Sequence, residues 1–343
     1  MPEFTHLHVH TQFSILDGAS KITSLIDKAE TSGMKSLAIT DHGNMFGVPL
    51  FIQSAKKKGI KPIIGCEVYV AAENRHQRSG KRDRKSFHLI LLAKNKTGYY
   101  NLSKLSSKGY LEGFYYNPRV DKELLREHSE GIIASSACLG GEIPTAIRNH
   151  GVEKAEEVLK EYLDIFGDDF YLELQDHGLP EQKEVNKVLL VLAAKYKVKL
   201  IATNDVHFIN AADYQAHRIL ICLNTGQDLD DATSLHYTGQ EYLKTPQEMA
   251  ELFEAYPEAL SNTQEIVDKV EAFDITTREI LLPHFPLPDG FDSENEYLRH
   301  LTYEGAKNLY KEITPEITER LDFELDVIKE WATPAISLLC RIS

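Results

Sequence analysis

Cysteine is scarce in this sequence, and long apolar runs are missing. The four cysteines lie far apart and form no CxxC pair, which argues against a disulfide scaffold and a zinc ribbon. No stretch approaches the roughly 18 apolar residues that a membrane span needs. The opening MPEFTHLHVH also lacks the basic and apolar regions of a signal peptide. We therefore expect a soluble, cytoplasmic protein that does not bind membranes.

Net positive charge is lacking as well. The 343 residues include 38 Lys and Arg against 52 Asp and Glu, a net charge of −14. A sequence-independent DNA coat needs net positive charge, so this class of protein is disfavoured. The charge is uneven, because residues 1–128 hold 20 basic and 12 acidic residues, whereas residues 129–343 hold 18 and 40. Any contact with nucleic acid should lie in the first third of the chain.

Short apolar runs, rich in β-branched residues, alternate with helical patterns in the first two thirds of the chain. For example, apolar residues recur at helical spacing from Ile22 to Ala29, after Ser20 as the expected N-cap. Such alternation predicts an α/β fold with a parallel sheet, either doubly wound or closed into a barrel. Seven strands in about 205 residues favour a barrel close to the eight-stranded type, whose active site would lie at the carboxyl ends of the strands. The predicted strands are 4–9, 36–40, 60–70, 87–93, 131–135, 170–174 and 199–203.

The pattern changes after about residue 210. Residues 213–270 read mostly as helices, and the segment LLPHFPLPDGFD (281–292) carries too many prolines for a helix or a central strand. A helical tail follows from 293 to 330. We expect a metal-binding barrel over 1–210, a helical completion of it over 211–280, and a linker with the start of another region over 281–343.

Polar side chains with metal-binding chemistry recur at the ends of the predicted strands. Each one alone has a structural explanation: His8 and His10 could be two polar residues on a half-exposed strand, and His88 or Cys138 could be core residues. Together they converge on one rim of a barrel. The candidates are His8, His10, Asp17, His42, Glu67, His88, Cys138, Asp205 and His207.

Nine ligand residues exceed the four that close one zinc site. They suit two or three divalent ions, bridged by a carboxylate such as Glu67. Imidazole and thiolate suit Zn²⁺ or Fe, and the carboxylates also admit Mn²⁺ or Mg²⁺. Clustered ions of this kind hydrolyse phosphate esters. The sequence contains no nucleophile elbow, no GxxxxGK[ST] loop and no GxGxxG after a strand, so these alternatives do not compete.

Two further features bear on substrate binding. The segment RHQRSGKRDRK (75–85) is a basic loop just before His88, and Arg82, Arg84 and Lys85 are candidates for contact with DNA phosphates. A solvated loop with no ligand is the equally simple alternative. His177 could contact substrate or the groups behind the metal ligands, or it could cap a turn.

These motifs resemble the PHP domain (polymerase and histidinol phosphatase), and more closely the PHP domain that opens the α subunits of bacterial DNA polymerase III. The resemblance covers roughly residues 1–330. The segments that carry it are HLHVHTQFSILDG (6–18), LAITDHGNMFG (37–47), PIIGCEVYV (62–70), FHLILLAKN (87–95), SACLGGEIP (136–144), YLELQDHG (171–178), ATNDVHF (202–208), TGQEYLKTPQEM (238–249) and LLPHFPLPDG (281–290).

The resemblance implies a distorted seven-stranded barrel with a cluster of two or three ions (Zn, Mn or Fe), bound by the nine residues above. It implies catalytic roles for Asp17, His42, Glu67 and Asp205, and a 3′–5′ exonuclease that proofreads the primer end of DNA. Full-length members are DNA-directed DNA polymerases that work with a sliding clamp and a clamp loader. A free-standing phosphatase for a small phosphate ester and a metal-stabilised platform for replisome proteins are the alternatives.

The last residues, 330–343, depart from the family pattern, and the carboxylates of a polymerase palm are missing. We therefore expect no nucleotide addition by this chain alone.

Overall fold

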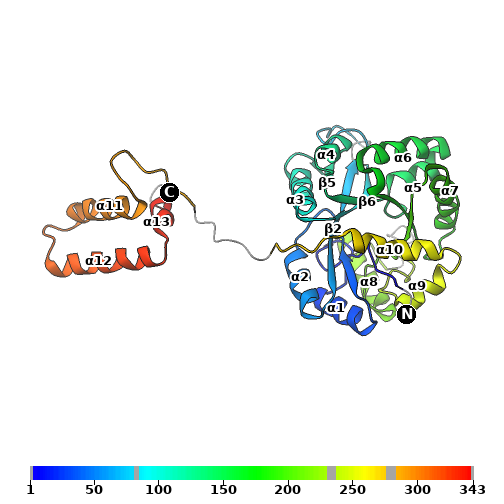
Figure 1. The fold of residues 1–343 in the computed structure, drawn as a ribbon, viewed down its shortest axis with the longest axis horizontal. Helices are drawn as coiled ribbons and strands as arrows, with labels where there is room; N and C mark the ends of the chain where they lie inside the picture. The colour runs from blue at the N-terminus through cyan, green and yellow to red at the C-terminus, as the bar shows by residue number, and fades with distance from the viewer. Residues whose placement is uncertain (1–2, 81–84, 230–236, 276–282, 341–343) are drawn as a thin grey trace. The chain divides into compact units, whose positions relative to one another are not determined.

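The computed structural model describes residues 3–80, 85–229, 237–275 and 283–340. The chain forms two compact units, Met1–Asp274 and Ile275–Ser343, which are described separately (Figure 1).

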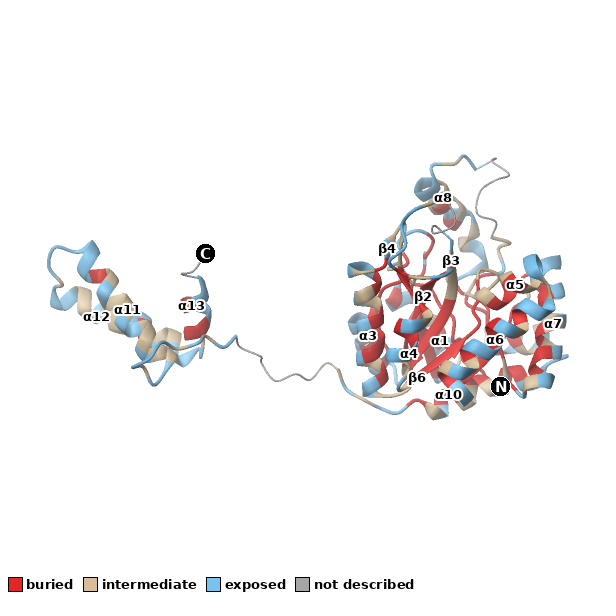
Figure 2. Cartoon of the chain, turned by 90° about the horizontal axis from the view of Figure 1, so that it is seen from above, coloured by how far each residue is buried: buried red, intermediate tan, exposed pale blue. Residues whose placement is uncertain are grey.

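The first unit is an α/β fold built on a curled mixed sheet, as the sequence predicts. The strands pair in the order β4-β5-β2-β3-β6-β7-β8, and β1 pairs with β2. Helices pack around this sheet with their buried faces turned inward (Figure 2). The strands are β1 (Ser36–Ile39), β2 (Lys61–Ala71), β3 (Ser86–Ala93), β4 (Phe114–Tyr115), β5 (Asn117–Val120), β6 (Ile132–Ser135), β7 (Phe170–Leu174) and β8 (Leu200–Ala202).

The expectation of a purely parallel sheet is wrong. Strand β3 runs antiparallel to both neighbours, β2 and β6. The chain connects β2 to β3 without a helix in the residues described there, and only antiparallel neighbours can be joined without a crossover. The β4–β5 hairpin was not predicted either, because strands of two and four residues are too short for a periodic pattern.

The segment 4–9 is extended but is not a regular strand, contrary to the prediction. Val9 shares one bridge with Val206, and Val206 receives a hydrogen bond from the amide of His10 at 2.7 Å. On its other side the carbonyl of Val9 accepts from the amide of Thr40 at 2.8 Å. The Thr40 hydroxyl oxygen accepts from the amide of Val9, which replaces a backbone partner and interrupts the ladder. The segment still spans the gap between β1 and the residues after β8, so it closes the barrel.

The first unit contains the helix predicted after Ser20. Helix α1 buries Ile22, Leu25, Ile26 and Ala29 as expected. Ser20 is not its N-cap, because the helix begins one residue later and Gln12 accepts from the amide of Ile22. The helices are α1 (Ile22–Thr31), α2 (Val48–Lys57), α3 (Lys96–Leu111), α4 (Lys122–Glu127), α5 (Glu142–His150), α6 (Val152–Phe166), α7 (Pro180–Tyr196), α8 (Tyr214–Thr225), α9 (Pro246–Leu252) and α10 (Pro257–Lys269), with short 3₁₀ turns at Gly167–Asp169 and Ala211–Asp213.

The second unit is helical. It contains α11 (Glu294–Leu309), α12 (Pro315–Glu330) and α13 (Pro334–Cys340). An ion pair between Arg299 and Asp322 at 2.6 Å joins α11 to α12. Across the described residues of both units, no helix combines the length and the apolarity that crossing a bilayer requires.

His6 lies within the segment that closes the barrel and is fully buried. Its Nε2 lies 2.8 Å from the carbonyl oxygen of Lys244, so it ties this segment to the chain before α9. Burial lowers the pKa of His6 to about 4, and the nearby ammonium groups of Lys244 and Lys28 act in the same direction.

This burial predicts a loss of stability in acid. Unfolded His6 binds a proton below its ordinary pKa of 6.5, whereas folded His6 does so only near 4. The unfolded state therefore binds more protons as the pH falls, and the free energy of unfolding drops by about 2 kcal/mol at pH 5 from this group. Urea unfolding of the wild type and of His6→Gln, both with chelator, should show that this pH dependence is weaker in the variant. Parallel curves from pH 7.5 to 5 would contradict the assignment.

Candidate metal centre

The carboxylate of Glu67 lies at the centre of a buried histidine cluster. Glu67 is in the middle of β2, not at the strand end that the sequence suggested, and its side chain is 1% exposed. Its Oε2 lies 2.7 Å from His42 Nδ1 and 3.2 Å from His10 Nε2. Its Oε1 lies 2.8 Å from His88 Nδ1 and 3.6 Å from His8 Nε2. Because β3 is antiparallel, His88 reaches this rim from the beginning of its strand.

Two further carboxylates complete the cluster. Asp205 Oδ1 lies 3.0 Å from His8 Nε2 and 3.3 Å from His10 Nε2. Asp17 Oδ2 lies 3.3 Å from His42 Nε2 and 3.8 Å from His207 Nε2. The structure thus brings the predicted histidine and carboxylate ligands together in one place.

Several atoms of this cluster are buried without a hydrogen-bond partner. They include both oxygens of Glu67, Oδ1 of Asp205, Nδ1 of His42 and Nε2 of His207. Buried polar atoms in native proteins nearly always have a partner. Nitrogen and oxygen atoms that face one another closely without hydrogen-bonding geometry fit a shared cation instead. Three groups of residues could each hold an ion, because the ligand atoms within each group lie within 4.8 Å of one another. The groups are His10–His42–His207, His8–His10–Glu67 and His42–Glu67–His88.

Cys138 also belongs to this rim. Its Sγ lies 3.6 Å from His88 Nδ1 and accepts a hydrogen bond from the amide of Gly140 at 3.4 Å. Burial raises the pKa of the Cys138 thiol well above its ordinary value, and the carboxylates of Asp205 and Glu67 add to this effect. The thiolate that binds metals therefore needs a cation nearby.

The first two histidines are oriented by polar side chains behind them. His8 Nδ1 donates to Oε1 of Glu173 at 2.9 Å, and this carboxylate is held by the hydroxyls of Thr203 and Ser135. Such a contact fixes the tautomer and leaves Nε2 with its lone pair toward the cluster.

His10 is oriented in a similar way. The Ser14 hydroxyl donates its proton to Oδ1 of Asp41 at 2.8 Å. Nδ1 of His10 lies 3.0 Å from the Ser14 hydroxyl oxygen, so His10 must be the donor in this second contact. Nε2 of His10 is then the acceptor atom, and it lies 3.1 Å from Nε2 of His8.

The carboxylates and imidazoles shift each other's pKa values. Burial alone would lower the pKa of His8, but Asp205 and Glu173 outweigh it and hold that pKa well above the ordinary value. Burial would raise the pKa of Glu67, but the imidazoles of His88 and His42 hold it well below its usual range. Burial lowers the pKa of His207 to about 3. A metal would have to displace the protons of those imidazoles whose pKa is raised. The affinity of the cluster for metal should therefore fall in acid.

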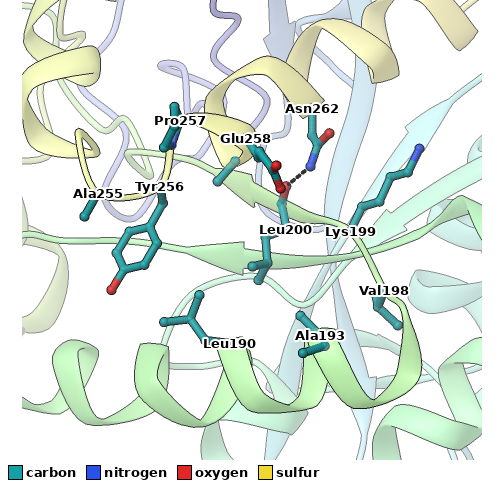
Figure 3. A pocket seen from close by; sticks show the side chains of 12 residues that line it. Leu190, Ala193, Val198, Lys199, Leu200, Ala255, Tyr256, Pro257, Glu258 and Asn262 are labelled. Atoms are coloured by element: carbon teal, nitrogen blue, oxygen red, sulfur yellow. Dashed lines mark hydrogen bonds between the residues drawn. The ribbon is translucent and has the colours of Figure 1, made fainter.

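The cluster opens into a cleft of about 280 Å³ whose wall includes His177. The Gln182 amide nitrogen lies 3.1 Å from His177 Nδ1, and His177 Nε2 lies 3.1 Å from the carbonyl oxygen of Asn204. His177 is therefore held between Gln182 and the backbone of Asn204, the residue before Asp205. A larger cavity of about 600 Å³ lies between α7, the start of β8 and the loop before α10 (Figure 3). Its lining contains no histidine or cysteine, so it does not compete as a metal site.

The basic loop is only partly available for DNA. Arg82 and Arg84 lie outside the described residues. Lys85 is exposed, with Nζ 5.4 Å from the centre of the Phe87 ring. Arg75 is buried and paired with Asp121 at 2.9 Å, so at least one positive charge of the loop is used inside the protein.

The supporting residues were harder to predict than the ligands. Ser14 and Tyr237 were not expected, although the Tyr237 hydroxyl donates to Oδ2 of Asp17 at 3.0 Å. Glu173 and Asp41 could have been found, since each is an acidic residue within or directly after a buried strand.

Known proteins support this description. The family model of the PHP domain matches residues 6–177, which is half of the chain. The chain belongs to the PHP domain family.

The curated relatives that the chain matches include DNA polymerase III subunits. The chain is 46% identical to the DNA polymerase III subunit alpha of Borreliella burgdorferi over 95% of its length, and 47% identical to that of Thermus aquaticus over 90%. It spans only 28% and 26% of these two relatives. A solved two-domain protein from Bacteroides vulgatus, described as containing a predicted PHP-like metal-dependent phosphoesterase, aligns with 60% of this chain and 52% of its own at 16% identity, with a TM-score of 0.38. That likeness is too distant to bear on function.

Glu173 offers a test of the metal centre that leaves the ligands themselves intact. Glu173→Gln removes the charge that orients His8, so metal affinity should fall by about 10- to 100-fold. Glu156→Gln is the control, because Glu156 of α6 pairs with Lys195 of α7 and neither helix carries one of the nine ligands. Competition titration with a chromophoric chelator measures both. Equal affinities for Glu173→Gln and the wild type would show that Glu173 does not orient a ligand.

Proposed function

We propose that this chain is the PHP region of a DNA polymerase III α subunit and a metal-dependent phosphodiesterase that removes nucleotides from the 3′ end of DNA. The observation that carries the proposal is the pair of Glu67 oxygens, buried without hydrogen-bond partners among imidazole nitrogens. The α-subunit relatives supply the biological setting, namely DNA and the other replisome proteins. The sliding clamp and clamp loader would be partners of the full-length protein.

The proposed ligands are the nine residues predicted from the sequence. Two or three divalent ions held by them would neutralise phosphate oxygens and lower the pKa of a bound water. Glu67 would bridge, because its two oxygens face different imidazoles. Asp17, His42 and Asp205 border the cleft as well as the cluster, so we propose catalytic roles for them beside the reacting phosphate. His177 would support that wall of the cleft.

We further propose that residues 211–280 complete this region and that residues 281–343 begin the polymerase region. The segment 211–280 contacts the opening of the chain: His217 Nε2 lies 2.7 Å from the carbonyl oxygen of Asp17, and the Thr263 hydroxyl accepts from the amide of Thr5.

A free-standing phosphatase is the competing enzyme function. The cleft of about 280 Å³ lies near the lower end of ligand sites, so it suits a single small group such as a terminal nucleotide.

Asp17 provides the direct test of the activity. Asp17→Asn keeps the side-chain shape but removes one charge beside His42, so hydrolysis of a 3′-mismatched primer should fall by about 100-fold or more. The control Asp27→Asn removes the same charge from an exposed position that pairs with Lys58. Circular dichroism should be unchanged in both variants.

The same assay separates the three functions. The exonuclease predicts chelator-sensitive shortening of the primer by the wild type, with little turnover of p-nitrophenyl phosphate. The reverse preference would establish the phosphatase. Hydrolysis of neither substrate by metal-loaded protein would overturn both and leave the structural platform.

A further inference from the structure

Aromatic residues gather at the β4–β5 hairpin, three of them exposed and Tyr115 half-buried. Phe114, Tyr115 and Tyr116 follow Tyr110 within six residues, and we call these four side chains the aromatic hairpin. Tyr110 is 42% exposed, Phe114 48% and Tyr116 58%. The rings of Tyr110 and Phe114 stack at 6.1 Å, and those of Tyr115 and Tyr116 lie edge to face at 4.9 Å. The metal centre uses none of these residues.

The hairpin lies one strand away from the metal ligands. Tyr69 of β2 pairs with Arg119 of β5 on one side and with His88 of β3 on the other. Its ring lies 5.9 Å from the ring of His42. No space separates the hairpin from the ligand loop, because a Cβ on Gly43 would lie 2.7 Å from Cγ of Pro118. Figure 2 shows β4 at the same end of the barrel as α8.

Tyr116 has a backbone conformation that its side chain does not favour. It forms the turn between the paired residues Tyr115 and Asn117, with φ at +64°. Bulky residues rarely adopt this left-handed region, whereas glycine does so without strain. Strained residues persist mainly where a function requires them. The backbone of this turn therefore does not explain why residue 116 is a tyrosine. A function of its exposed ring would explain it.

The sequence before and through the hairpin is rich in basic residues. Residues 73–119 hold eleven Lys and Arg against three Asp and Glu, within a chain whose net charge is −14. Arg75 and Arg119 are buried, and three more of the eleven lie at 81–84, outside the described residues. Two of these cations lie at the end of α3, next to the hairpin: Arg78 donates to the carbonyl of Glu112 at 2.6 Å, and Lys108 pairs with the Glu112 carboxylate at 3.2 Å. Exposed aromatic rings beside basic groups are the usual means of binding unpaired nucleic acid.

We propose that the aromatic hairpin is a stacking platform for unpaired bases near the 3′ end of a DNA strand whose last phosphodiester reaches the metal centre. The role in feeding this centre rests on the proposed exonuclease function, whereas binding of single-stranded DNA does not. Stacking tolerates any base, so the platform would select frayed ends over paired ends without reading sequence.

Fluorescence anisotropy with a labelled oligothymidylate tests the platform, using the whole chain without added metal so that no hydrolysis occurs. A second oligonucleotide carries abasic sites at its last three 3′ positions. Tyr116→Gly should bind the oligothymidylate about 10-fold more weakly than the wild type. The wild type should prefer the intact oligonucleotide to the abasic one, and the variant should lose this preference. Because glycine suits the turn, the melting temperature should not fall.

Tyr256→Ala is the matched control, since Tyr256 is 38% exposed beside the cavity of Figure 3. It should bind both oligonucleotides as the wild type does. Equal binding by Tyr116→Gly and the wild type, or no preference of the wild type over abasic DNA, would overturn the proposal. Loss of self-association in Tyr116→Gly with unchanged DNA binding would assign the hairpin to a protein contact. Absence of hydrolysis in separate metal-loaded assays would count against the exonuclease but would not alter the binding result.

Discussion

The buried charge of Glu67 is the constraint on which the site depends. A carboxylate that is removed from water costs several kcal/mol unless opposite charge surrounds it. Imidazoles from the opening segment, from the loop after β1 and from β3 face its two oxygens. Protonated imidazoles can neutralise it, but they leave its oxygens without hydrogen bonds. Cations shared by the same nitrogens and oxygens satisfy both requirements.

The barrel brings these groups together through segments that are distant in the chain. His8 and His10 reach Glu67 because the irregular opening segment closes the sheet between β1 and the residues after β8. Asp17 is fixed from residues 200 or more positions later, through His217 and Tyr237. Helices α8 to α10 and Tyr237 are thus part of the support of the site, and they belong to the same compact unit as the barrel.

The ligands could be predicted because they are polar residues within or next to apolar runs, where side chains such as His88 stand out. The strand directions could not, since the antiparallel course of β3 depends on the connection before it. The opening segment reads as a strand, but one hydroxyl, that of Thr40, takes the place of a ladder partner. Tyr237 and Ser14 carry no signal at all, because an ordinary polar residue becomes a supporting group only when the fold places it beside a ligand.

The central claim is that these residues form a multinuclear metal centre. Elemental analysis of the whole chain, purified after growth with ample metal and dialysed without chelator, tests it most directly. The nine converging ligands predict two or three transition-metal ions per chain, since one coordination sphere needs only about four of them. One ion or fewer per chain would contradict the account.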